Sequence, residues 1–76
     1  MKFLTQIRVD GVVLGEVVDV SRTVSLEACQ IVVNENGGEC ELYQAPIRAK
    51  AWAVYSCIAG QPKPKFIRME AKTNDN

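Results

Sequence analysis

Residues 46–59 read PIRAKAWAVYSCIA, and this stretch decides the fold. Its side chains alternate with a period of two, which is the pattern of a β-strand. One face carries mostly small and apolar side chains, namely Ile47, Ala49, Ala51, Ala53, Tyr55 and Cys57. The other face carries Arg48, Lys50, Trp52, Val54, Ser56 and Ile58. Because proline cannot donate a ladder hydrogen bond, Pro46 belongs at the first residue of this strand. We therefore expect a long central strand over residues 46–59, with a helix packed closely on its small-residue face.

The N-terminal part of the chain predicts a β-hairpin. Residues 2–9 and 12–20 are rich in β-branched residues and flank Asp10 and Gly11. Asp-Gly is a strong hairpin signal, because both central positions of a type I′ turn need a positive φ. In the second strand Gly15 and Glu16 indicate a bulge or a place at the sheet edge. The expected core face of that strand consists of Val12, Leu14, Val18 and Val20.

The middle of the chain predicts a helix between Ser25 and Gly37. Ser25 would be the N-cap, Glu27 would interact with the helix dipole in the first turn, and Gly37 would be the C-cap. The expected buried stripe consists of Ala28, Cys29, Ile31 and Val32. A second hairpin is the alternative, since QIVV and CELY flank the turn-forming NENGG. The capping signature favours the helix.

The remaining elements complete an α+β fold of order ββαβββ, with one helix packed on a mostly antiparallel sheet. Residues 39–45 predict a short strand with Leu42 inward and Tyr43 outward. Residues 65–71 predict the last strand, with Phe66 and Arg68 on one side. We expect a single domain over residues 1–71 and a disordered polar tail over residues 72–76.

Composition is that of a small globular protein. The 76 residues are 47% hydrophobic, and nine basic residues balance nine acidic ones. Neutrality argues against a general polyanion binder, although residues 46–68 hold five basic residues and no acidic one. Three cysteines without a CxxC pair predict free thiols in the reducing cytoplasm. No apolar run approaches the ~20 residues of a membrane span, so no membrane partner is expected.

The sequence offers little for catalysis, so we expect no enzyme, no cofactor and no metal site. Histidine, the usual acid–base residue, is absent from the chain. The glycines match neither a P-loop nor a dinucleotide fingerprint. Cys57 is expected to be a buried structural thiol. Glu39 and Glu41 could share a cation weakly, but a solvated acidic face is the expected role.

The functional hypothesis concerns the basic and aromatic side chains of the long strand and its neighbour. The expected partner-binding residues are Arg48, Lys50, Trp52, Lys65 and Arg68. Tryptophan and arginine dominate protein–protein hot spots. Cations interleaved with aromatic rings also hold single-stranded nucleic acid, which is the alternative. A purely structural role for Trp52 is a third interpretation. A homodimer could cover the apolar residues expected on the face away from the helix, namely Val13, Val17, Val54 and Ile58.

These observations lead to the expectation of a non-catalytic protein-binding module. It would occupy a surface of a larger protein or complex, as an inhibitor or an adaptor. In size, in lacking catalytic residues and in having one helix on a sheet, the chain is similar to small phage proteins that bind and disable a host complex, such as polymerase inhibitors and anti-CRISPR proteins. That similarity covers no alignable stretch.

Overall fold

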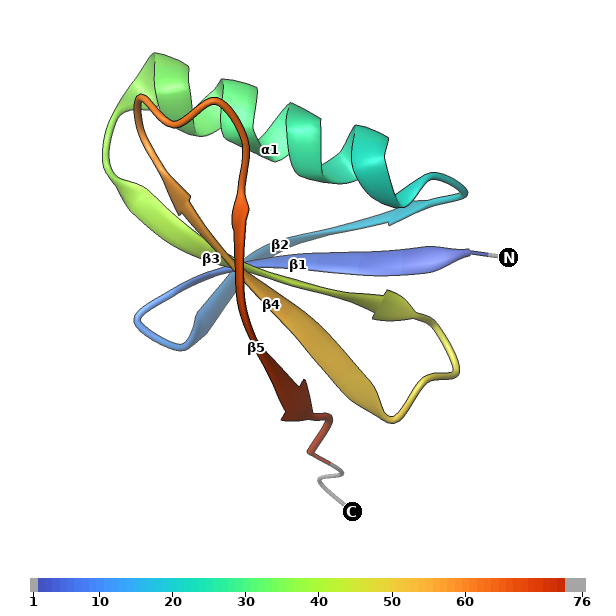
Figure 1. The fold of residues 1–76 in the computed structure, drawn as a ribbon. Helices are drawn as coiled ribbons and strands as arrows, with labels where there is room; N and C mark the ends of the chain where they lie inside the picture. The colour runs from blue at the N-terminus through green and yellow to red at the C-terminus, as the bar shows by residue number, and fades with distance from the viewer. Residues whose placement is uncertain (1, 74–76) are drawn as a thin grey trace.

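The computed structural model describes residues 2–73. Its elements are β1 (Phe3–Val9), β2 (Val12–Asp19), α1 (Arg22–Asn36), β3 (Glu39–Pro46), β4 (Ala51–Ile58) and β5 (Lys65–Ala71). The strands form one antiparallel sheet in the order β2-β1-β3-β4-β5, and α1 lies across one side of this strongly twisted sheet (Figure 1). The predicted ββαβββ order is confirmed. We call the side under α1 the helix face and the other side the open face. Among the described residues, no helix is long and apolar enough to cross a membrane.

The first hairpin forms as the sequence predicts, and β2 is an edge strand with a bulge. Asp10 and Gly11 have φ values of 51° and 80°, which a type I′ turn requires. Gly15 pairs with Ile7, and the next pair along is Val13 with Arg8, so Leu14 is the extra residue of the bulge. The predicted core face of this strand is wrong. Its four residues are 54–72% exposed, because the helix contacts only part of the edge strand.

The helix begins earlier than predicted. Its N-cap is Ser21, whose Oγ accepts a hydrogen bond from the Val24 N–H at 3.2 Å. The predicted cap, Ser25, is instead a buried residue of the first turn, and its hydroxyl donates to the Ser21 carbonyl at 3.4 Å. Asp19 accepts a hydrogen bond from the Ser21 N–H and so holds Ser21 in place as the cap. The predicted C-cap is confirmed, since Gly37 has a φ of 79° and its N–H donates to Val33. The alternative second hairpin is wrong.

The strand that was expected over residues 46–59 is shorter at its start. Pro46 ends β3, where it pairs with Phe3, and residues 47–50 form the turn into β4. The Ala49 N–H donates to the Pro46 carbonyl at 3.0 Å and closes this turn. Arg48 and Lys50 therefore precede β4 and do not share a strand face with Trp52.

Two buried glutamines fasten the helix to the sheet. Gln44 Nε2 donates to Thr5 Oγ1 at 3.0 Å and to the carbonyl of Arg22, the first helical residue, at 2.9 Å. Gln30 Nε2 donates to the carbonyl of Ile58, the last residue of β4, at 3.0 Å. Each glutamine is at most 3% exposed. A buried amide is costly unless it is hydrogen-bonded. A shift of the helix would break these hydrogen bonds, so they fix its position on the sheet.

Each face of the sheet has its own apolar cluster. On the helix face Cys29, Leu42 and Cys57 are buried, with partly buried neighbours that include Ile7 and Tyr55. On the open face the buried cluster consists of Tyr43, Ala45, Trp52 and Val54. The prediction that Val13, Val17, Val54 and Ile58 form an exposed apolar face away from the helix is wrong, since Val54 is fully buried and Val17 pairs with Thr5 on the helix face.

Candidate functional site

Trp52 lies in the open-face cluster and is only 7% exposed. Its ring packs edge-to-face against Tyr43, with centroids 6.1 Å apart and an interplanar angle of 87°. The indole therefore does not project into water as a contact residue would. Its position fits the purely structural interpretation of this residue.

Cations of the same chain cover this aromatic pair. The Arg8 Cζ lies 3.8 Å from the Tyr43 ring centroid, and the Lys72 Nζ lies 4.6 Å from the Trp52 ring centroid. Lys72 Nζ also donates to the carbonyls of Pro46 and Ile47, each at 3.3 Å. Cation–π contacts stabilise such pairs most where water is excluded. Sequence reasoning missed this arrangement, because it depends on which strands are neighbours. It also assigned Lys72 to a disordered tail, of which residues 74–76 lie outside the described part of the chain.

Arg68 lies on the open face, and acidic neighbours neutralise it. Its guanidinium forms ion pairs with Glu41 and Glu70, each at 3.2 Å, and donates to the Tyr43 hydroxyl at 2.9 Å. The hydrogen bond from Arg68 lowers the pKa of Glu41, whereas burial raises the pKa of Tyr43. Phe66 was expected beside Arg68, but a bulge in the β4–β5 pairing places Phe66 opposite Tyr55 and Arg68 opposite Val54. The two side chains are thus on different faces.

The β4–β5 side of the helix face is uncovered, because within residues 2–73 α1 contacts β1 to β4 but not β5. Two hollows of about 400 and 520 Å³ lie there, and Tyr55 lines both. Their apolar lining includes Ala51, Ala53, Tyr55, Phe66 and Met69, and their cations are Arg22, Lys50, Lys63 and Lys65. Among the described residues, no acidic side chain lines either hollow. We call this surface the β4–β5 groove.

The β4–β5 groove brings together two of the five predicted binding residues, Lys50 and Lys65. Phe66 is 52% exposed and Met69 is 61% exposed, so large apolar side chains there meet water. Arg48 is also exposed, in the turn just before Lys50. The alanines that were expected under the helix line the groove instead. The period-two pattern gave Ala51, Ala53 and Tyr55 a common face, but only the position of α1 shows that this face is open.

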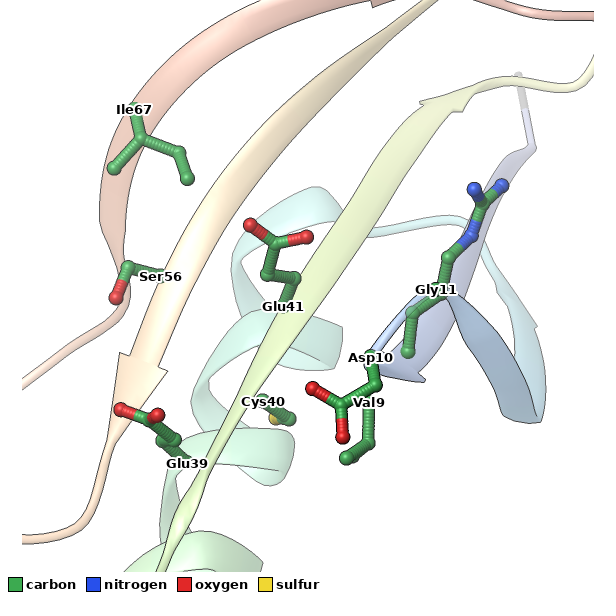
Figure 2. A pocket seen from close by; sticks show the side chains of 9 residues that line it. Val9, Asp10, Gly11, Glu39, Cys40, Glu41, Ser56 and Ile67 are labelled. Carbon is green, nitrogen blue, oxygen red and sulfur yellow. The ribbon is translucent and has the colours of Figure 1, made fainter.

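A third hollow, of about 460 Å³, lies on the open face, and its lining includes the acidic residues Asp10, Glu39 and Glu41 together with Arg8. Figure 2 shows the carboxylates of Glu39 and Glu41 on the side of β3 away from the helix, whereas Cys40 points back toward the helix. Asp10, at the hairpin turn, and Ser56 also line this hollow. Within the described part of the chain, no group of three or more cysteine, aspartate or glutamate side chains is placed to hold a metal ion.

The three cysteines gather under the helix as free thiols. Cys40 and Cys57 are directly paired across β3 and β4, and Cys29 of α1 packs in the same cluster. Cys57 is fully buried, and its thiol donates to Gln30 Oε1 at 3.4 Å. Burial raises the pKa of Cys57 to about 12, with a further contribution from Cys40. A thiol with so high a pKa is a poor nucleophile.

We expect Cys57 to react with iodoacetamide at pH 8 about a thousandfold more slowly in the folded protein than a free cysteine does, because only the thiolate reacts. The unfolded thiol ionises near pH 8.5. Stability from the neutral thiol is therefore present below that pH and is lost as the pH rises toward about 12. Peptide mass spectrometry after labelling in buffer and in urea measures the rates. Native labelling of Cys57 at the free-cysteine rate would contradict its burial.

The fold is that of a small α+β protein with one helix on a five-stranded antiparallel sheet. The β4–β5 groove is its exposed candidate site. No known protein family matches the chain, and neither the curated proteins nor the solved structures contain a match.

Proposed function

We propose that this protein is a non-catalytic binding module that holds an acidic, apolar segment of a larger protein in the β4–β5 groove. The observation that carries this proposal is an uncovered apolar floor whose charged rim is entirely basic among the described residues. A protein that binds such a segment prevents the segment from contacting other molecules. This is how an inhibitor without catalytic groups acts. The same contact would serve an adaptor. The three free thiols, two of which are buried, fit a reducing setting such as the cytoplasm.

The floor of the groove suits apolar side chains of a partner. Ala51 and Ala53 leave room above the sheet, while Phe66 and Met69 present exposed apolar surface beside them. Aromatic residues and methionine are enriched at interface cores, where they exclude water. Met69 also adapts its shape to a partner, because its side chain is unbranched and flexible.

The rim of the groove favours negative charge in that partner. Arg22 and Lys50 line one hollow, and Lys63 and Lys65 line the other. The chain as a whole has no net charge, so this positive surface is local. Complementary charges at a rim guide encounter and register more than they add affinity.

Nucleic acid is the alternative ligand, because the same cations stand beside two aromatic rings. Tyr55 and Phe66, however, already pack edge-to-face, with centroids 5.7 Å apart and an interplanar angle of 75°. Because these two rings pack against each other and the chain carries no net charge, we favour a protein segment as the ligand. Phosphate binding weakens steeply with rising salt, whereas an apolar-centred contact does not.

The test is affinity capture from a lysate with and without nuclease, comparing Phe66→Ala with the matched control Ile67→Ala. Ile67 is the next residue of β5, is 41% exposed and lines the open-face hollow instead. We expect the alanine at position 66 to reduce the captured protein about tenfold or more, and the alanine at position 67 to leave it unchanged.

The proposal fails if both alanine variants retain the same proteins as the unmodified chain. It also fails if nuclease removes all captured material, since that result identifies nucleic acid as the ligand. Circular dichroism of both variants confirms that each is folded. Lys65→Glu tests the charge of the rim, and we expect this variant to capture less protein at low salt than the unmodified chain does.

A further inference from the structure

Cys40 and Cys57 already lie where a disulfide would place them. They are directly opposite each other on β3 and β4, and both side chains belong to the cluster under the helix. Residues that face each other across antiparallel strands have Cα atoms about 4.5–5.5 Å apart, and a disulfide joins Cα atoms about 4.4–6.8 Å apart. The two sulfur atoms can therefore be joined with little movement of either strand.

The two thiols also interact with each other in the reduced protein. Burial raises the pKa of Cys40, and hydrogen bonding with the Cys57 thiol acts in the opposite direction. After burial, Cys40 is also the largest influence on the pKa of Cys57, ahead of Cys29. Of the two other thiols, Cys57 is thus the one that is hydrogen-bonded to Cys40.

Cys40 is the thiol that a small reagent can reach. Cys29 and Cys57 are buried, but Cys40 is partly exposed. Among the described residues, β1 pairs with β3 only as far as Glu41, so Cys40 has a strand neighbour on the β4 side alone. A hollow of about 270 Å³ beside α1 and β2 has Cys40 in its lining. This volume equals that of several water molecules, so it has room for hydrogen peroxide.

We propose that Cys40 and Cys57 form a reversible disulfide in the presence of a small hydroperoxide, with Cys40 oxidised first and Cys57 as the resolving thiol. The Cys40 sulfur attacks one oxygen of hydrogen peroxide, the O–O bond breaks, and the second oxygen leaves as water with the thiol proton. Cys40 is then a sulfenic acid. The Cys57 sulfur attacks the Cys40 sulfur, the S–O bond breaks, and the hydroxyl leaves as water with the Cys57 proton. Two thiols and one peroxide thus give one disulfide and two water molecules.

The position of Cys57 compensates for its low reactivity toward reagents in solution. A thiol with a raised pKa is a poor nucleophile toward a molecule that must diffuse to it. Groups held next to each other in the right geometry react as if their concentration were about 10⁵ M or more. Because the strands hold Cys57 opposite Cys40, the second step occurs within the chain, and no reagent has to reach the buried thiol.

The buried surroundings tolerate the loss of the Cys57 proton. In the reduced protein this thiol donates to Gln30 Oε1 at 3.4 Å. Gln61 Nε2 donates to the same oxygen at 3.5 Å, so that oxygen keeps a donor after oxidation. Gln30 Nε2 keeps its hydrogen bond to the Ile58 carbonyl. The disulfide therefore leaves both polar atoms of Gln30 with partners, and the helix stays fastened to the sheet.

The test is a disulfide map of the reduced, folded protein after treatment with hydrogen peroxide at neutral pH. Cys29 and Cys40 lie on one tryptic peptide, so glutamyl endopeptidase, which cleaves after Glu35 and Glu39, is used to separate them. We expect a peptide pair that joins Cys40 to Cys57, a free thiol at Cys29, and full reversal by dithiothreitol. Oxidation in urea should give mixed pairs, because only the folded sheet holds Cys40 opposite Cys57.

Serine variants separate the roles of the three thiols, and circular dichroism shows whether each variant is folded. Cys57→Ser should stop at the sulfenic acid of Cys40, which dimedone traps. Cys40→Ser should form no disulfide and leave Cys57 reduced. Cys29→Ser is the matched control and should form the disulfide at an unchanged rate.

Three results would overturn the proposed disulfide. The first is a disulfide that includes Cys29 in the folded protein. The second is the same mixture of pairs with and without urea. The third is a protein whose Cys40 and Cys57 stay reduced while free cysteine in the same solution is oxidised. None of these results bears on partner binding through the β4–β5 groove, because neither cysteine lines it.

Discussion

Trp52→Ala is expected to lower the free energy of unfolding by about 3–5 kcal/mol, which is the usual cost of deleting a buried aromatic side chain. Domains of this size have total stabilities of only several kcal/mol. The indole is 7% exposed and touches Tyr43 edge-to-face, so alanine leaves a cavity and removes an aromatic contact. Urea unfolding followed by circular dichroism measures this loss, since the variant has no tryptophan fluorescence.

Trp52→Phe is the matched control, because it keeps an aromatic ring against Tyr43. It should cost clearly less than alanine at the same position. The unmodified protein should also show blue-shifted emission that acrylamide quenches weakly. A Trp52→Ala variant as stable as the unmodified protein would mean that the indole is exposed, as a partner-binding role requires.

Leu42→Ala is expected to cost about 3–5 kcal/mol on the other face of the sheet. Leu42 is fully buried between Ile7 on β1 and Tyr55 on β4, which are its paired neighbours in the sheet. Cys29 of α1 lies in the same cluster. Contacts from three sides leave little freedom for the site to collapse around alanine. Thermal or urea unfolding measures the change.

Leu42→Met is the control for volume, and it should cost less than about 1.5 kcal/mol. Because Leu42 and Trp52 lie in separate clusters, their effects should add in the double variant. That variant is then expected to be unfolded at room temperature. A loss below about 1 kcal/mol for Leu42→Ala would contradict a core under the helix.

Local signals in the sequence predicted local structure well. Asp10 and Gly11 specify a turn that only positive φ values allow, and Gly37 ends the helix for the same reason. The strand at residues 65–71 also agrees with the structure. Ser21 was missed as the N-cap because Ser25 has the same chemistry four residues later. The hydrogen bond from the Ser21 N–H to Asp19 favours Ser21 over Ser25 as the cap. It joins the start of the helix to the last residue of β2, a contact that the capping pattern alone does not show.

The arrangement of the site could not be predicted, because it depends on which strands become neighbours. Arg8 covers Tyr43 only because β1 pairs with β3 as well as β2. The period-two pattern also does not distinguish a solvent face from a second buried face, and so Trp52 was expected in water. The bulge opposite Tyr55 shifts the register by one residue, which separates Phe66 from Arg68.

The most direct test of binding through the β4–β5 groove is photo-crosslinking from positions 66 and 67. The photoreactive residue p-benzoylphenylalanine replaces Phe66 in one protein and Ile67 in another, and each is irradiated with the captured partner. We expect a crosslinked partner from position 66 and none from position 67, since these residues lie in hollows on opposite faces of the sheet. Crosslinking from position 67 alone would place the partner on the open face and contradict the proposed function.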